Sequence, residues 1–194
     1  MIRLIIAAVS LTVFCAVHVS AEEKPLFQTT KEEIVKELTR PVSRTRGFVP
    51  QCKTRDITVY EKKQTQTIEK IIVVSSNDNR PRVNLKIEFD FDSYRIRPES
   101  YRLIRELGYA LEIEKLSRRR IAINGHTDSD GTALYNLGLS LNRALAVKQY
   151  LTANFNITPD NLRILGYGEA MPLVSNTSFV NKQINRRVEV MVER

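Results

Sequence analysis

Apolar residues repeat with a regular period from residue 83 to the end of the chain. Between residues 83 and 91 they alternate with polar residues, which predicts a half-buried strand. Pro98 begins a helical pattern that reaches Leu111, and a longer helix is expected from about Ala133 to Ala153. Further strands are expected at residues 121–125, 162–167 and 188–192. The order of these elements predicts an α/β (α+β two-layer) fold with helices packed on one sheet.

The long helix carries an apolar stripe that is expected to face the sheet. The stripe consists of residues 133, 137, 140, 144, 147 and 151. Asn136, Arg143 and Tyr150 recur every seven residues along its border. This spacing places Arg143 at an edge between helix and sheet, where a ligand can reach it.

Residues 22–81 lack this regularity and predict a partly ordered N-terminal region. Thr30 to Glu33 has the pattern of a capping box, and Pro41 closes the short helix expected after it. Residues 40–47 have the composition of a linker, and residues 57–60 and 68–74 are strand-like. Those two runs could pair with each other or with the next domain. A dense turn cluster at residues 75–81 indicates the boundary of a second domain, residues 82–194.

Residues 1–21 have the pattern of a secretory signal peptide. A short positive head precedes an apolar run from Leu4 to Val19, and small residues favour cleavage after Ala21. The alternative is a retained membrane anchor. Lipidation at Cys15 is disfavoured because bulky Phe14 precedes it. Cys52 is then the one cysteine left, which excludes an internal disulfide. The expected location is the periplasm or the periplasmic face of the outer membrane.

The net charge of +8 falls to +7 once residues 1–21 are removed with their single arginine. The basic residues are spread along the chain, with local clusters at 118–120 and 186–187. They do not form the basic stripe with interleaved aromatic residues that nucleic-acid binders use. We therefore expect no nucleic-acid partner, and the arginines at 118–120 are interpreted as a solvated loop. An anionic cell wall or membrane surface is the better counterpart.

Six short motifs in register carry a resemblance to a known family. They are Phe89–Tyr94, Gly125–Asp128 with Gly131, Tyr135-Asn136, Leu139–Ala144, Gly166–Glu169 and Asn185–Glu189. Together they resemble the OmpA-like C-terminal domain over about 112 residues, 83–194. The resemblance implies helices packed on a four-stranded mixed sheet in the order β-α-β-α-β-β.

The resemblance also implies a function, which is non-covalent binding of peptidoglycan through the diaminopimelate residue of its stem peptide. The matched residues imply that Asp128 takes the ammonium group of diaminopimelate and Arg143 its carboxylate. Four further matched residues line or flank this peptidoglycan-binding site: Phe91, Asp92, Thr127 and Arg187, the last with a partly structural role. The chain departs from the family pattern at residues 141–142 and at the extra acid of Ser129-Asp130.

The chemistry of these residue types agrees with that assignment. A carboxylate is an acceptor for an ammonium group, and a guanidinium makes two parallel hydrogen bonds to a carboxylate. Three plainer interpretations compete with it. Asp128 could be a turn or helix cap with Arg143 as its surface ion-pair partner. Asp92-Ser93 could be a strand-end turn. Arg186 and Arg187 could be charges that protect an edge strand.

Catalysis, cofactors and metals find no support in the sequence. Its two histidines are His126 and His18, and His18 lies in the signal segment, so a histidine-based metal shell cannot be completed. A Gly-x-Ser-x-Gly motif is missing. The expected partner is the peptidoglycan stem peptide, with envelope proteins as further candidates. The alternative function is a membrane-anchored, stator-like or secretion-machine protein that the same domain fixes to the wall.

Overall fold

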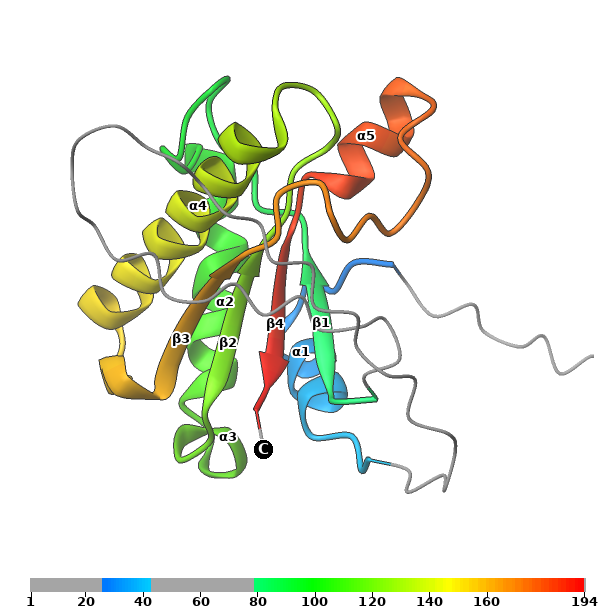
Figure 1. The fold of residues 1–194 in the computed structure, drawn as a ribbon. Coiled ribbons are helices and arrows are strands. Elements are labelled where there is room, and N and C mark those ends of the chain that lie inside the picture. Colours follow the sequence, from blue (N-terminus) through cyan, green and yellow to red (C-terminus); the bar gives the residue numbers. More distant parts are fainter. Residues whose placement is uncertain (1–25, 43–78, 194) are drawn as a thin grey trace, which may run out of the picture.

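The computed structural model describes residues 26–42 and 79–193 (Figure 1). The predicted signal peptide, Cys52 and the strand-like runs at 57–60 and 68–74 lie outside the described residues. The predictions for these segments therefore stay predictions.

Four strands form one mixed sheet. They are β1 (Arg82–Leu85), β2 (Ile121–Gly125), β3 (Leu162–Gly166) and β4 (Val188–Val192). Their order across the sheet is β1-β4-β2-β3. Strands β2 and β3 are parallel, whereas β4 runs antiparallel to both of its neighbours. The predicted helices on a four-stranded mixed sheet are confirmed. Because β4 lies inside the sheet, the interpretation of Arg186 and Arg187 as guards of an edge strand is wrong.

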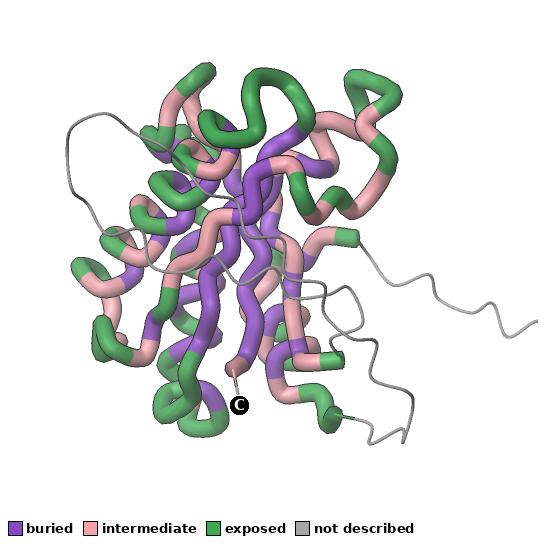
Figure 2. Tube along the Cα trace, in the orientation of Figure 1, coloured by how far each residue is buried: buried purple, intermediate pink, exposed green. Residues whose placement is uncertain are grey.

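Within the described residues, five helices accompany the sheet. They are α1 (Lys31–Leu38), α2 (Tyr101–Leu111), α3 (Glu114–Ser117), α4 (Ala133–Asn154) and α5 (Phe179–Asn185). Short 3₁₀ turns at Pro98–Ser100 and Pro159–Asn161 precede α2 and β3. Helix α4 packs on β2 and β3, and α2 packs on α4 and α1. Figure 2 shows the central strands buried along their whole length.

The N-terminal helix α1 belongs to the same core. Thr30 caps its amino end and forms the predicted capping box with Glu33. Its apolar residues Ile34 and Leu38 are buried in the common hydrophobic cluster, and the helix contacts α2 and β1. The backbone N–H of Lys31 donates to the carboxylate of Glu106 on α2, at 3.0 Å. The core therefore includes a segment that precedes the predicted domain boundary.

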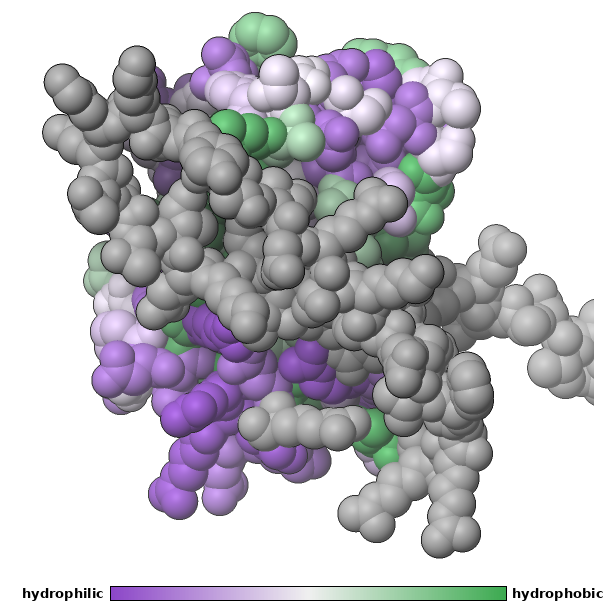
Figure 3. All heavy atoms as spheres, in the orientation of Figure 1, coloured by the Kyte–Doolittle hydropathy of each residue, from purple (hydrophilic) through white to green (hydrophobic). Residues whose placement is uncertain are grey.

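Two of the predicted apolar segments extend beyond the strand or the buried helix face that the structure shows. The strand expected over residues 83–91 keeps its ladder only to Leu85, and Phe91 is 99% exposed. The chain turns back there because Asp92 adopts a left-handed conformation with φ of 53°. In α4 the stripe is buried from Ser140 to Leu151, but Ala133 is exposed. Hydrophilic side chains gather near α3 (Figure 3), where residues 118–120 are all exposed.

Helix α4 approaches the strands very closely where glycines allow it. A methyl group on Gly125 would overlap the backbone carbonyl of Ser140. A methyl group on Gly166 would lie 2.8 Å from the carbonyl oxygen of Leu137, closer than real side chains come. The carboxyl ends of β2 and β3 therefore touch the helix backbone itself, and α4 is held in one position over them.

His126 directly follows β2 and stacks on Tyr167, which follows β3. The ring centroids are 5.2 Å apart and the planes differ by 11°. The imidazole is buried, and neither ring nitrogen has a hydrogen-bond partner among the residues that the structure describes. Burial, reinforced by the charges of Arg187 and Arg82, holds the pKa of His126 well below its usual value.

The first prediction concerns the glycine contact. Gly125→Ala should destabilise the protein by about 3 kcal/mol or more, since the new methyl group has no space and the backbone must move. Gly138→Ala is the control, because this exposed glycine of α4, the helix that contacts Gly125, has no described residue within 4 Å of an added methyl group. The control should raise stability by about 0.5–1 kcal/mol. Urea unfolding of both variants measures the two effects, and equal stabilities would contradict the close contact.

The second prediction concerns pH. The unfolded chain binds a proton at His126 below about pH 6.5, whereas the folded protein resists it. The free energy of unfolding should therefore keep the full contribution of neutral His126 above that pH, and it should decrease as the pH drops below it. Melting temperatures at pH 7.5 and 5.5 test this, and His126→Phe, which keeps a ring against Tyr167, should show a smaller fall. An unchanged pH dependence in that variant would exclude His126 as the cause.

Candidate ligand-binding site

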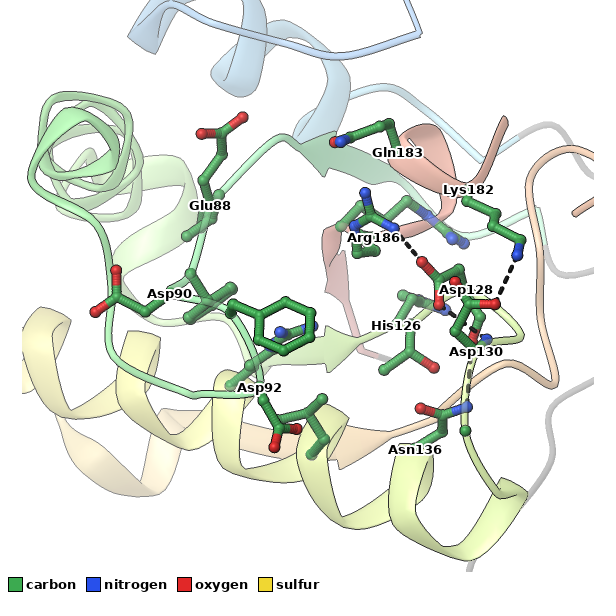
Figure 4. Close-up of a pocket in the computed structure, with 18 of the residues that line it drawn as sticks. Glu88, Asp90, Asp92, His126, Asp128, Asp130, Asn136, Lys182, Gln183 and Arg186 are labelled. Atoms are coloured by element: carbon green, nitrogen blue, oxygen red, sulfur yellow. Dashed lines mark hydrogen bonds and ion pairs between the residues drawn. The ribbon is translucent and has the colours of Figure 1, made fainter. Parts of the chain in front are cut away.

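A pocket of about 760 Å³ opens at the carboxyl ends of β1 and β2, beside the residues that precede β4. Loops after β1 and β2 form its walls together with α4 and α5 (Figure 4). Strands β1 and β2 both run antiparallel to β4, which brings their carboxyl ends to one edge of the sheet, a common place for ligands. All six residues assigned from the sequence line this pocket: Phe91, Asp92, Thr127, Asp128, Arg143 and Arg187.

The carboxylate of Asp128 already has partners within the protein. Its side chain is buried, and the residue is 5% exposed. One carboxylate oxygen accepts the backbone N–H of Asp130 at 3.0 Å, and the other forms an ion pair with Arg186. The backbone oxygen of Asp128 accepts a hydrogen bond from Asn136 at 3.3 Å. The surface ion pair between Asp128 and Arg143 is wrong, because both residues are buried and the partner of Asp128 is Arg186. The interpretation of Asp128 as a turn cap fits its bond to the backbone of Asp130.

The guanidinium of Arg143 makes only part of the hydrogen bonds that it can donate. The residue is 8% exposed, its Nε donates to the backbone oxygen of Ser93 at 3.0 Å, and its guanidinium lies 5.0 Å from the centre of the Phe89 ring. Burial and the charge of Arg186 lower the pKa of Arg143 to about 10, so it stays charged at neutral pH. Among residues 26–42 and 79–193, its two terminal nitrogens have no hydrogen-bond partner. They are available to a ligand.

Phe91, Asp92 and Thr127 form part of the pocket wall. Asp92 accepts a hydrogen bond from the Tyr135 hydroxyl, which links the strained turn to the first turn of α4. Phe91 stands exposed beside it. The backbone N–H of Thr127 donates to the backbone oxygen of Gly168 at 2.9 Å, and its buried hydroxyl has no partner within residues 26–42 and 79–193.

Arg187 connects loops within the protein. Its nitrogens donate to the side-chain oxygen of Asn84 and to the backbone oxygens of Met171 and Asn185, at 3.1–3.4 Å. Burial lowers its pKa to about 10. The partly structural role that the resemblance implied for this arginine fits these internal bonds.

Helix α5 and the residue that follows it supply two cations, Lys182 and Arg186, that the sequence did not assign to the site. Lys182 pairs with Asp130 at 2.6 Å, and Arg186 pairs with Asp128, so two basic residues four positions apart hold one loop (Figure 4). Lys86, after β1, donates to the backbone oxygen of Gln183 on α5. The i, i+4 spacing of Lys182 and Arg186 was a signal in the sequence, but their partners lie 52 and 58 residues away.

The part of the chain that the structure describes contains no group of histidine, cysteine and acidic residues able to hold a metal ion. Within the same residues, no helix combines the length and apolar character of a membrane span. The pocket instead combines a buried carboxylate with a buried, partly unbonded guanidinium. Such a pair is suited to a small group that carries both an ammonium and a carboxylate.

Comparison with known proteins finds relatives of this domain. Outer membrane porin F of Pseudomonas aeruginosa is 38% identical over 112 residues, which are 58% of this chain and 31% of the porin. The peptidoglycan-associated lipoprotein of the same species is 34% identical over 102 residues, 53% of this chain and 58% of the lipoprotein. This chain thus spans less than two thirds of the length of either curated relative.

A solved structure shares the fold. The cell wall anchor of the T6SS from Pseudomonas aeruginosa superimposes with a TM-score of 0.50 and 26% identity, covering 58% of this chain and 80% of that one. The model of the OmpA family matches residues 88–186, about half of the chain, and this range includes most of the residues that line the pocket. The chain therefore belongs to the OmpA family.

Proposed function

We propose that this domain binds peptidoglycan non-covalently, through the diaminopimelate residue of the stem peptide. One observation carries the proposal: Asp128 and Arg143 are both buried in the same pocket, and no described residue bonds the terminal nitrogens of Arg143. The free end of diaminopimelate bears an ammonium and a carboxylate on one carbon. Asp128 takes the ammonium, and Arg143 takes the carboxylate with two parallel hydrogen bonds.

The neighbouring groups support this assignment. The Nε bond to Ser93 and the contact with Phe89 orient the guanidinium, so its free edge is already positioned for a ligand. The unpartnered hydroxyl of Thr127 supplies a further hydrogen bond. Phe91 and Asp92 form the wall beside the bound peptide, and Arg187 holds the loops in place. Binding needs no bond cleavage, so the proposed activity is tethering of the envelope to the wall and not catalysis.

The names of the relatives support the same class of ligand. One is a peptidoglycan-associated lipoprotein and another is the cell wall anchor of a secretion system. We place the protein, after export, in the periplasm or on the periplasmic face of the outer membrane.

The likeness to a secretion-system anchor favours a second candidate, in which residues 1–21 stay in the membrane and the domain fixes a larger machine to the wall. We expect a mature protein that begins at Glu22, because the small residues before it suit signal peptidase. The mass of the protein purified from envelopes measures this. A retained N-terminus would favour the anchored machine component.

The binding site predicts the behaviour of two conservative variants. Asp128→Asn keeps the shape of the side chain and removes its charge. Arg143→Lys keeps the charge and removes the planar group that makes two parallel hydrogen bonds. Each leaves a desolvated ligand charge without its partner, which costs about 2–5 kcal/mol, or roughly thirtyfold or more in affinity. The double variant should be little worse than either single one, because both groups act on one ligand centre. Co-sedimentation with purified sacculi measures the losses.

The controls separate this site from general charge attraction. Arg118→Ala lies in an exposed loop and should change binding only slightly and mainly at low salt. Sacculi of the lysine type lack the second carboxylate and should bind weakly. Wild-type binding by both Asp128→Asn and Arg143→Lys, in proteins that melt normally, would show that the site is elsewhere.

A further inference from the structure

Six basic and five acidic residues line the pocket, and a zwitterionic diaminopimelate end does not neutralise this small positive surplus. Among the described residues, Lys86, Arg143 and Arg187 line it without an ion pair to any carboxylate. Burial is the main cause that lowers the pKa of each of these three cations. Unpaired cations in a desolvated pocket are costly, and they favour a ligand with an excess of anionic groups.

The ion pair between Arg186 and Asp128 adds to this imbalance when a ligand arrives. An ammonium that binds Asp128 competes with Arg186 for the same carboxylate oxygen. The other oxygen is already occupied by the backbone N–H of Asp130. Arg186 would then be left unpaired beside Arg143 and Lys86, whose pKa values its charge already lowers. Repulsion among three neighbouring cations opposes binding unless a second anion enters the pocket.

Arg186 is the cation best placed to receive that anion. The Arg187 guanidinium is bonded within the protein, and the Lys86 ammonium donates to carbonyl oxygens around α5. The Arg186 side chain is 31% exposed, and Asp128 is its one partner among residues 26–42 and 79–193. Once released, its guanidinium can make two parallel hydrogen bonds to a second carboxylate.

We propose that Arg186 exchanges partners during binding, leaving Asp128 to the ligand ammonium and taking a second carboxylate that lies next to diaminopimelate in the stem peptide. That group is the free α-carboxylate of the γ-linked glutamate. Arg186 is therefore a specificity-determining residue that selects stem peptides with a free glutamate carboxylate over those in which this group is an amide. The inference rests on the proposed function.

The test uses two synthetic tripeptides, alanyl-γ-glutamyl-diaminopimelate and its α-carboxamide, titrated by calorimetry into the full mature chain. Wild type should bind the free acid about tenfold or more tightly than the amide, because the amide loses a charge-assisted pair. Arg186→Gln should bind both peptides with affinities within about twofold of each other. It should also bind the amide better than wild type does, because Asp128 no longer has an internal competitor.

Further variants decide between the possible outcomes. Arg118→Gln is the distant control and should keep the wild-type ratio. The inference is overturned if wild type does not distinguish the two peptides, if Arg186→Gln keeps the wild-type ratio, or if Lys182→Gln abolishes the ratio and Arg186→Gln does not. Asp128→Asn reports separately on the proposed function, since it should weaken both peptides. If it weakens neither, the diaminopimelate site itself is wrong.

Melting curves of Arg186→Gln check that loss of the internal ion pair has not unfolded the site. Should that variant melt too low for titration, Arg186→Lys gives a second measurement. Lysine keeps the charge but cannot make the two parallel hydrogen bonds. The ratio of the affinity for the free acid to the affinity for the amide should therefore fall but remain above one. An unchanged ratio in Arg186→Lys would exclude two-pronged recognition.

Discussion

The direct contact between the backbone of α4 and the ends of β2 and β3 is the constraint on which the site depends. Gly125 and Gly166 leave no room for a side chain between strand and helix. Asn136, Ser140 and Arg143 are carried on the helix surface that this contact holds against the sheet. A shift of one ångström here would move Arg143 relative to Asp128, because one is fixed to the helix and the other to the loop after β2.

The same contact explains why charged groups can be buried at this edge of the sheet. Each buried charge has a fixed partner nearby: Ser93 and Phe89 for Arg143, Asp130 and Arg186 for Asp128. Such partners offset part of the desolvation cost, which would otherwise exceed the gain from any single ion pair. The part of the cost that stays uncompensated is what a complementary ligand relieves.

The periodic elements and the pocket residues could be predicted from the sequence, whereas long-range pairings could not. The apolar periods located β2, β4 and α4 to within a residue or two, and the motifs grouped Asp128 with Arg143. Local patterns carry no information on which strand lies next to which, so the central place of β4 was missed. The partner of Arg186 was missed for the same reason, since Asp128 is 58 residues away. Helix α1 has a clear start signal, but its burial against α2 depends on tertiary contacts.

Phe91 stands at the rim of the pocket with nearly all of its surface exposed, on a turn that Asp92 holds in a strained conformation. Its ring can be exchanged for another aromatic ring without disturbing the core. The protein contains no tryptophan. An indole placed at this position would be the one such fluorophore in the chain, and its emission would report directly on whatever enters the pocket.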